Sequence, residues 1–262
     1  LFFFYSPFDS RFCNVISDYY MLLSSFMTKN QILSANFSII PNPWKFGKYA
    51  EVLQKPEFMR GLRNTLIVAM PVLIVGGFTS SLAAFSFSKL KFKGKDGIFL
   101  GLLATMMIPF AVVMIPQYVM FTKMGWTNSL LPLIIPGLFG NVSIIFFLRQ
   151  NLTSVPDSMV EAAKIDGANG LKLFRYITMP LVSPVTFYLL ITGLIGGFQV
   201  FVEVLVMVPN GGLNYSAATV VFYLYDKAFG NNQMGYGSAM AFILAIFIFI
   251  ITAINFMAQD KW

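Results

Sequence analysis

Long apolar segments alternate with short polar ones along this chain, at a length that suits membrane-spanning helices. A hydrocarbon core of about 30 Å requires ~20 apolar residues in a helix. Five segments reach or approach that length, over 64–88, 98–121, 130–148, 181–208 and 236–258. A less regular apolar stretch near the start, with Asp9, Arg11 and Asp18 in it, is interpreted as a further, irregular span. The pattern predicts an all-α, polytopic membrane protein of about six transmembrane helices, with 1–262 forming one domain.

The composition strengthens this prediction and removes several classes of chemistry. The chain is 57% hydrophobic and 11% charged, whereas average soluble domains carry roughly 25% charged residues. It has no histidine, which excludes imidazole metal sites and His-based catalytic triads, and the lone Cys13 excludes an internal disulfide. The net charge of +7 is explained by membrane topology and anionic headgroups rather than by nucleic acid. Neither a metal site nor a catalytic site is expected.

Basic residues set the predicted orientation. The segment 89–97 holds four lysines and one acid, which marks it as cytoplasmic. Alternation then places 149–180 and both chain ends inside, and 122–129 and 209–235 outside. The segment 29–63 argues against this orientation, because it is placed outside and holds six basic residues and two acids. Its basic density is lower than that of 89–97. The chain begins without methionine, so a cytoplasmic segment is expected to precede it.

The polar segment 149–180 has the pattern of a structured insertion. Ser154 is predicted to cap a helix that has Pro156 and Asp157 in its first turn and ends after about three turns at Gly167. A turn at Asn169-Gly170 and a second short helix over 171–178, stopped by Pro180, are expected to follow.

The first of these helices carries two small residues, Ala162 and Ala163, framed by the charges of Glu161, Lys164 and Asp166. Small side chains on an exposed helix allow another protein's backbone to approach closely. Two interpretations remain open: the helix docks a soluble partner, or it lies at the membrane surface without one.

The spacing within this segment resembles a known motif. Glu161-Ala162-Ala163, then Asp166-Gly167-Ala168, then Ile177 and Pro180, resemble the E-A-A loop of bacterial ABC importer permeases. The resemblance extends from about Tyr20 to the end of the chain. The segments 86–99, 107–118, 148–177 and 235–241 are similar to the carbohydrate-importer branch, which includes the maltose and glycerol-phosphate permeases.

This resemblance implies a type I ABC importer permease fold in the bacterial inner membrane, with a cytoplasmic coupling helix. Carried over residue by residue, the ATPase-docking surface comprises Glu161, Ala162, Ala163, Asp166 and Gly167. The implied partners are a second, different permease, two ABC ATPase subunits and an extracytoplasmic binding protein. The segment 197–201 and the Gly211-Gly212 loop are more similar to the other permease type, so which half of the heterodimer this chain forms stays open.

Energy is expected to come from the partners. The chain has no phosphate-binding loop, since Gly94-Lys95 is followed by Asp96 and lacks the preceding glycine at the required spacing. ATP and magnesium are therefore assigned to the ATPase subunits, and no cofactor is expected in this chain.

Candidate pathway residues follow from polarity within the spans. Glu203 is the only acid inside the five long predicted spans, and a charge at mid-membrane costs at least ~2.5–3.5 kcal/mol on insertion scales. It is expected either to face the pathway with Gln199, one turn away, or to lie at the interface near a helix end. Asn141 and Tyr118 suit sugar binding by residue type. The loop 209–216 and a following helix over 217–229 are expected either to reach a binding protein, as the resemblance implies, or to act as a connector.

These observations favour a non-catalytic permease subunit for a sugar or oligosaccharide. An ABC permease for another solute, such as glycerol phosphate, is the first alternative. An ion-coupled secondary transporter leaves the E-A-A loop unexplained. A membrane-embedded enzyme is disfavoured by the absence of histidine and by the single acid within the spans.

Overall fold

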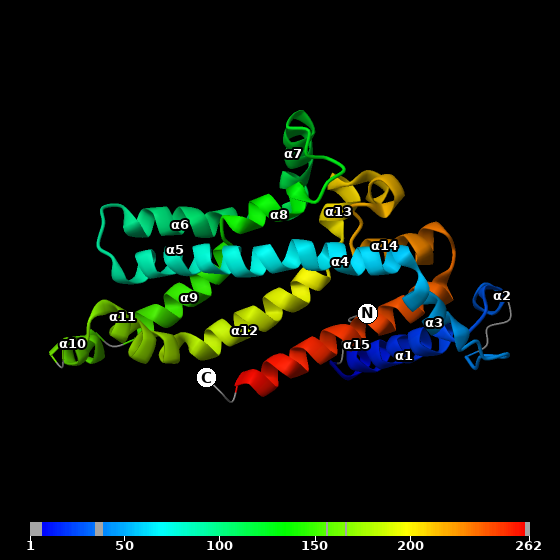
Figure 1. Ribbon diagram of the computed structural model, residues 1–262, viewed down its shortest axis with the longest axis horizontal. Helices are drawn as coiled ribbons and strands as arrows, with labels where there is room; N and C mark the ends of the chain where they lie inside the picture. The colour runs from blue at the N-terminus through cyan, green and yellow to red at the C-terminus, as the bar shows by residue number, and fades with distance from the viewer. Residues whose placement is uncertain (1–6, 35–38, 156, 166, 260–262) are drawn as a thin grey trace, which may run out of the picture.

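The computed structural model describes residues 7–34, 39–155, 157–165 and 167–259. Those residues form helices and turns without a strand, which confirms the all-α prediction. The long helices run side by side along the long axis of the molecule (Figure 1). In chain order, the first helices are α1 (Pro7–Ser25), α2 (Lys29–Ile32), α3 (Gly47–Gln54), α4 (Pro56–Pro71), the π-helical turn η1 (Val72–Gly76), α5 (Gly77–Lys89), α6 (Lys95–Thr105) and α7 (Phe110–Lys123). The remaining elements are α8 (Leu131–Leu138), α9 (Val142–Ser154), α10 (Asp157–Ile165), α11 (Gly170–Leu173), the π-helical turn η2 (Phe174–Thr178), α12 (Met179–Phe198), α13 (Val202–Met207), the 3₁₀ turns η3 (Pro209–Gly211) and η4 (Leu213–Tyr215), α14 (Val220–Tyr225), the π-helical turn η5 (Asp226–Gly230) and α15 (Met234–Gln259).

Within the described residues, four helices are long and apolar enough to cross a membrane, and one bent pair makes a possible fifth. The four are Pro56–Lys89, Leu131–Ser154, Phe174–Phe198 and Met234–Met257. The helix α1 is continuous over 19 residues and packs against α15. Its three charged side chains keep it outside this group, so four or five of the about six expected spans are found by length and composition in the part of the chain that is described.

The predicted span 98–121 is wrong as a single helix. Its two halves, α6 and α7, meet at an angle of 91°. The break falls before Pro109, which stands at the N-cap of α7 with an extended ψ of 134°. Proline lacks an N–H and disfavours helical backbone in the residue before it. Pro116, the second proline of this segment, is accommodated inside α7.

The predicted span 181–208 is also wrong at its end. The helix α12 stops at Phe198, and a separate six-residue helix, α13, follows. Gln199 has a φ of −98° and a ψ of 9°, and Phe201 is non-helical as well. Phe198 is buried in a core cluster, which includes residues of α3, α4, α14 and α15. Burial of this ring fixes the end of α12 and turns the chain into the outer region.

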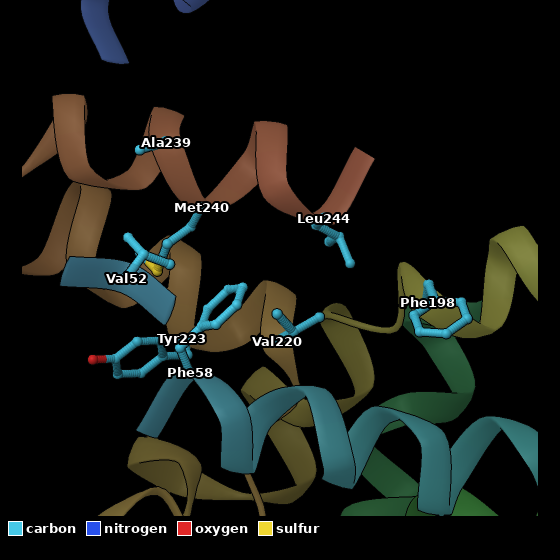
Figure 2. Close-up of a cluster of buried hydrophobic side chains, with 8 residues drawn as sticks. All are labelled: Val52, Phe58, Phe198, Val220, Tyr223, Ala239, Met240 and Leu244. Atoms are coloured by element: carbon cyan, nitrogen blue, oxygen red, sulfur yellow. The ribbon is translucent and has the colours of Figure 1, made fainter. Parts of the chain in front are cut away.

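That core cluster joins elements far apart in the sequence (Figure 2). It comprises Val52, Phe58, Phe198, Val220, Tyr223, Ala239, Met240 and Leu244. The short helices α3 and α14 are thereby packed against α4 and α15. In Figure 1 this end of the molecule lies opposite the end that carries α10, α11 and the α5–α6 connection. The grouping agrees with the predicted topology, in which 89–97 and 149–180 share one side and 209–235 lies on the other.

The middle of the first long span is held against α8 and α9 by close backbone contacts. Thr79 Oγ1 donates a hydrogen bond to the carbonyl of Leu138 at 2.9 Å, and the Asn141 N–H donates to Ser80 Oγ at 2.9 Å. A Cβ built on Gly76 would overlap the carbonyl oxygen of Gly137. The π-turn η1 therefore requires glycine where α8 approaches.

This contact leads to a prediction with a neighbouring control. Gly76→Ala is expected to destabilise the protein by about 1–3 kcal/mol, because the methyl group forces the two helices apart. Gly77→Ala introduces the same methyl group where nothing lies within 4 Å and should be neutral or slightly stabilising. Thermal unfolding of both variants in one detergent measures the difference. Equal melting temperatures would contradict the close approach at η1.

Candidate functional site: the coupling loop

The polar segment between α9 and α12 contains a short helix, as predicted, but this helix begins later than expected. Ser154 is the last residue of α9, and its hydroxyl donates to the carbonyl of Asn151 at 2.7 Å. The prediction of Ser154 as N-cap is therefore wrong, and α10 starts at Asp157. The cause is tertiary: Leu148 and Leu152 are buried, so packing extends α9 past the membrane boundary that the sequence indicated.

The end of α10 matches the prediction. Gly167 has a φ of +80°, and the N–H of Ala168 donates to the carbonyl of Ala163 at 2.9 Å. This bond closes a Schellman motif, in which a left-handed residue ends the helix. A Cβ at Gly167 would have nothing within 4 Å. No other part of the described chain therefore packs against the turn where a Gly167 side chain would lie.

The residues proposed for docking share this exposed helix. Glu161 and Ala162 are exposed and Ala163 is half-buried, whereas Asp166 lies outside the described residues. The adjacent Ile165 is 86% exposed. Small and apolar side chains on the outside of a charged loop are typical of a protein-contact surface. The structure thus adds Ile165 to the exposed surface, a residue that the motif alone did not single out.

The base of α10 is tied to the neighbouring lysine-rich loop. Lys89 Nζ donates to the carbonyl of Val155 at 3.2 Å. The adjoining cluster of buried residues comprises Ala84, Phe87, Phe99, Ile145, Leu148 and Leu152. It joins α5, α6 and α9 before the loop begins. The helix α10 itself packs mainly against α11, and the three packed helices hold the chain segment that leads into it.

Arg149 completes this support. Its Nε donates to the carbonyl of Phe87 at 3.1 Å, and its Nη2 contacts Asp96 Oδ1 at 3.2 Å. Its guanidinium lies 3.9 Å from the centroid of the Phe99 ring. One side chain therefore links the ends of α5, α6 and α9. Arg149 entered the prediction from sequence only as the first residue of the polar segment 149–180. A basic residue at the end of a predicted span, close to an aromatic-rich loop, was the signal that could have indicated its structural role.

The segment after α11 departs from the prediction. The chain continues from α11 through η2 into α12, so Pro180 does not stop a helix. In η2 the N–H of Met179 bonds to the carbonyl of Phe174, five residues back. This wider π-helical turn changes the backbone register that Pro180 meets, and proline is tolerated in the first turn of α12. The segment 149–180, predicted to be the coupling loop, therefore runs directly into a membrane span.

The four proposed pathway residues do not form one cluster. Tyr118 packs against a buried cluster that contains Val204 of α13, which brings α7 close to the residue after Glu203. Gln199 is exposed at the end of α12, and Glu203 is half-buried in the first turn of α13. The two are therefore not neighbours on one helical face, and Glu203 lies outside the described span. Asn141 caps α9, where its Oδ1 accepts from the Ser143 and Ile144 N–H groups at 2.9 and 3.3 Å.

The loop before α14, which the sequence predicts to lie outside and which is called the outer loop, is anchored on α4. The buried Asn64 donates to the carbonyls of Ser216 and Ala218, both at 2.9 Å. Thr65 Oγ1 accepts from the N–H of Val220 at 3.0 Å. Tyr215 donates to Asp226 Oδ2 at 2.6 Å, and burial, followed by this hydrogen bond, raises the pKa of Tyr215. The tyrosine therefore remains a donor at neutral pH and closes the loop against η5. The helix expected over 217–229 is present as α14 and η5.

Several apolar helices of membrane-spanning length, with an exposed glycine-terminated helix between two of them, define the class: a polytopic membrane protein. The family model for the "binding-protein-dependent transport system inner membrane component" matches residues 74–261. This chain belongs to that family. The family and the apolar spans place it in the inner membrane.

Relatives with described transport roles include two oligosaccharide permeases. The chain is 37% identical over 141 residues to the arabinooligosaccharides transport system permease protein AraP of Bacillus subtilis, covering 52% of this chain and 45% of that protein. It is 26% identical to the diacetylchitobiose uptake system permease protein DasC of Streptomyces coelicolor, covering 85% of this chain and 79% of the other. The chain spans about half the length of AraP.

A solved structure shares the fold over the whole chain. The crystal structure of a bacterial ABC transporter involved in import of the acidic polysaccharide alginate aligns with a TM-score of 0.72 at 18% identity. The alignment covers 100% of this chain and 99% of that chain. The predicted type I importer permease fold is thereby confirmed.

Proposed function

We propose that this chain is a permease subunit of an ATP-driven importer for a sugar or oligosaccharide delivered by a binding protein. The observation that carries the proposal is the exposed helix α10, closed at Gly167 and placed between the packed helix α9 and the span that begins at η2. A partner that pushes or turns α10 would move the spans through the chain on either side of it: Val155, held by Lys89, comes before α10, and α11 runs through η2 into α12 after it. Oligosaccharide permeases among the relatives favour this substrate class.

The proposal includes the subunits that supply energy and substrate. Two ATPase subunits would bind ATP and magnesium and seat α10 in a groove through Glu161, Ala162 and Ala163. A second permease would complete the pathway, and the outer loop anchored by Asn64 would meet the binding protein. ATP binding would favour one conformation of the ATPase pair, and the rigid loop would pass that bias to the spans.

The test is substrate-dependent ATPase stimulation in the reconstituted complex. Binding protein loaded with an oligosaccharide should raise ATP hydrolysis, whereas binding protein loaded with glycerol phosphate should not. Stimulation by glycerol phosphate alone would favour the first alternative, a permease for a non-sugar solute. Uptake driven by an ion gradient in vesicles without any ATPase would instead support a secondary transporter.

Glu203 provides a prediction for the pathway. Glu203→Ala should lower uptake by roughly tenfold while subunit assembly is retained. If the Glu203 carboxylate accepts a hydrogen bond from the substrate in the pathway, loss of that bond to a charged group costs about 1.5–3 kcal/mol. Glu203→Gln keeps an acceptor oxygen and should lose less. Uptake assays paired with co-purification of the complex measure both properties. Wild-type uptake by the alanine variant would assign Glu203 to the interface rather than to the pathway.

A further inference from the structure

The loop between α5 and α6 divides its four lysines into two pairs. Lys89 and Lys95 turn inward: Lys89 Nζ donates to Val155, and Lys95 Nζ donates to the carbonyls of Ser88 and Leu90, both at 3.1 Å. Lys91 and Lys93 are exposed. Neither has a hydrogen bond or an ion pair to any residue that the structure describes. Two lysines therefore shape the loop, and two remain available.

The apolar side chains of the same loop are exposed as well. Leu90 is 49% exposed and Phe92 is 41% exposed. The Phe92 ring is held against Phe87, with ring centroids 5.9 Å apart, so it is positioned at the edge of the cluster behind the coupling loop. Lysines thus alternate with a leucine and a phenylalanine along a short extended segment.

The loop lies where a bilayer surface is expected. It leaves α5 at Lys89, the last residue of a 34-residue membrane span. It enters α6 after Gly94, whose φ of +80° permits the tight turn. Side chains at this level meet headgroups and the upper part of the acyl chains. At that boundary, exposed apolar side chains can leave water for the acyl region, and lysines without an acidic partner can pair with headgroup phosphates.

We propose that Lys91 and Lys93, with Leu90 and Phe92 inserted beside them, form a binding surface for anionic phospholipid in the membrane. The ammonium groups pair with lipid phosphates, and the two apolar side chains enter the acyl region. Because Lys89 connects this loop to Val155, bound lipid also steadies the base of α10. The lysines contribute a preference for anionic lipid of about fivefold each.

The test uses the full chain in vesicles with a fluorescent reporter at residue 92. Phe92→Trp is reconstituted in phosphatidylcholine that contains an equal minor fraction of brominated phosphatidylglycerol or of brominated phosphatidylcholine. Fluorescence of the protein without this substitution is subtracted as background. Stronger quenching by the brominated phosphatidylglycerol is expected, with a weaker preference at high salt.

The double variant Lys91→Gln/Lys93→Gln should abolish that preference. Lys45→Gln/Lys123→Gln removes the same charge from exposed positions outside this loop and should preserve it. Equal quenching by the two lipids would overturn the proposal. So would the absence of quenching, which would place the loop away from the bilayer, against protein or water. Loss of the preference on adding inorganic phosphate at constant ionic strength would mark a soluble-anion site and would also overturn it.

Two further measurements keep the proposal testable if the Phe92→Trp variant does not fold. Leu90→Trp provides a second reporter in the same loop. Native mass spectrometry of the unsubstituted chain should show retained phosphatidylglycerol, which the Lys91→Gln/Lys93→Gln variant loses. Equal retention by both proteins would contradict the assignment without any tryptophan substitution.

Discussion

Replacing Ala162 with arginine is expected to release the ATPase from the permease and to reduce uptake by more than tenfold. Ala162 is exposed on α10, so the substitution leaves the isolated chain folded and inserted. In the proposed groove, the long charged side chain would hold the two surfaces apart. Hot-spot positions, which cluster near the centre of an interface, cost about 2 kcal/mol or more when they are changed. Co-purification of the ATPase and uptake in vesicles measure the effect.

A matched control separates docking from a general effect of added charge. Gln54→Arg places the same side chain on an exposed helical position of α3, at the other end of the molecule (Figure 1). This variant should bind the ATPase and support uptake normally. If Ala162→Arg behaves like Gln54→Arg, α10 is a surface helix without a partner, and the second interpretation of this segment is correct.

Arg149→Gln is expected to give the largest loss of stability on the cytoplasmic side, about 2–4 kcal/mol. The substitution removes the hydrogen bond to the Phe87 carbonyl and the stacking on Phe99. Hydrogen bonds from charged groups contribute about 1.5–3 kcal/mol, and a partly buried cation–π contact adds ~1 kcal/mol. Arg149→Lys should recover little, because lysine has no planar group to stack while it donates. Thermal unfolding in detergent measures the loss.

A substitution at Asp96 tests how much the ion pair contributes to the stabilising effect of Arg149, beside its contacts with Phe87 and Phe99. Its side chain is 88% exposed, against 21% for Arg149, so solvent screens the ion pair. Asp96→Asn should therefore cost less than about 1 kcal/mol. A double-mutant cycle with Arg149→Gln should return a small coupling energy. A loss in Asp96→Asn as large as that in Arg149→Gln would show that the ion pair, rather than Phe87 and Phe99, holds the loop.

Where sequence reasoning failed, a tertiary contact outweighed the local signal. Ser154 has the chemistry of an N-cap, but packing of Leu152 carries α9 through it. Pro180 has the chemistry of a helix stop, but the π-turn η2 admits it. The opposite holds at Gly167, where the need for a positive φ is a property of the residue itself, and the predicted helix end is correct.

The candidate pathway residues show the same limit. Glu203 and Gln199 were paired through helical spacing, and this pairing fails because the burial of Phe198 ends α12 before them. Asn141 was chosen for its polarity, yet its side-chain oxygen caps α9. Polarity indicates that a residue needs partners, but only the packed chain shows which partners it has.

The sequence by itself determined the helical membrane class, the approximate spans, the place of the coupling loop and the family resemblance. These properties follow from hydropathy over ~20 residues and from motif spacing, both of which are local. The tertiary structure alone decided where spans break, which side chains hold α5, α6 and α9 together, and which lysines of the α5–α6 loop remain available. Those outcomes depend on contacts between residues distant in sequence, such as Arg149 with Phe87 and Asn64 with Ser216. No local pattern encodes such contacts.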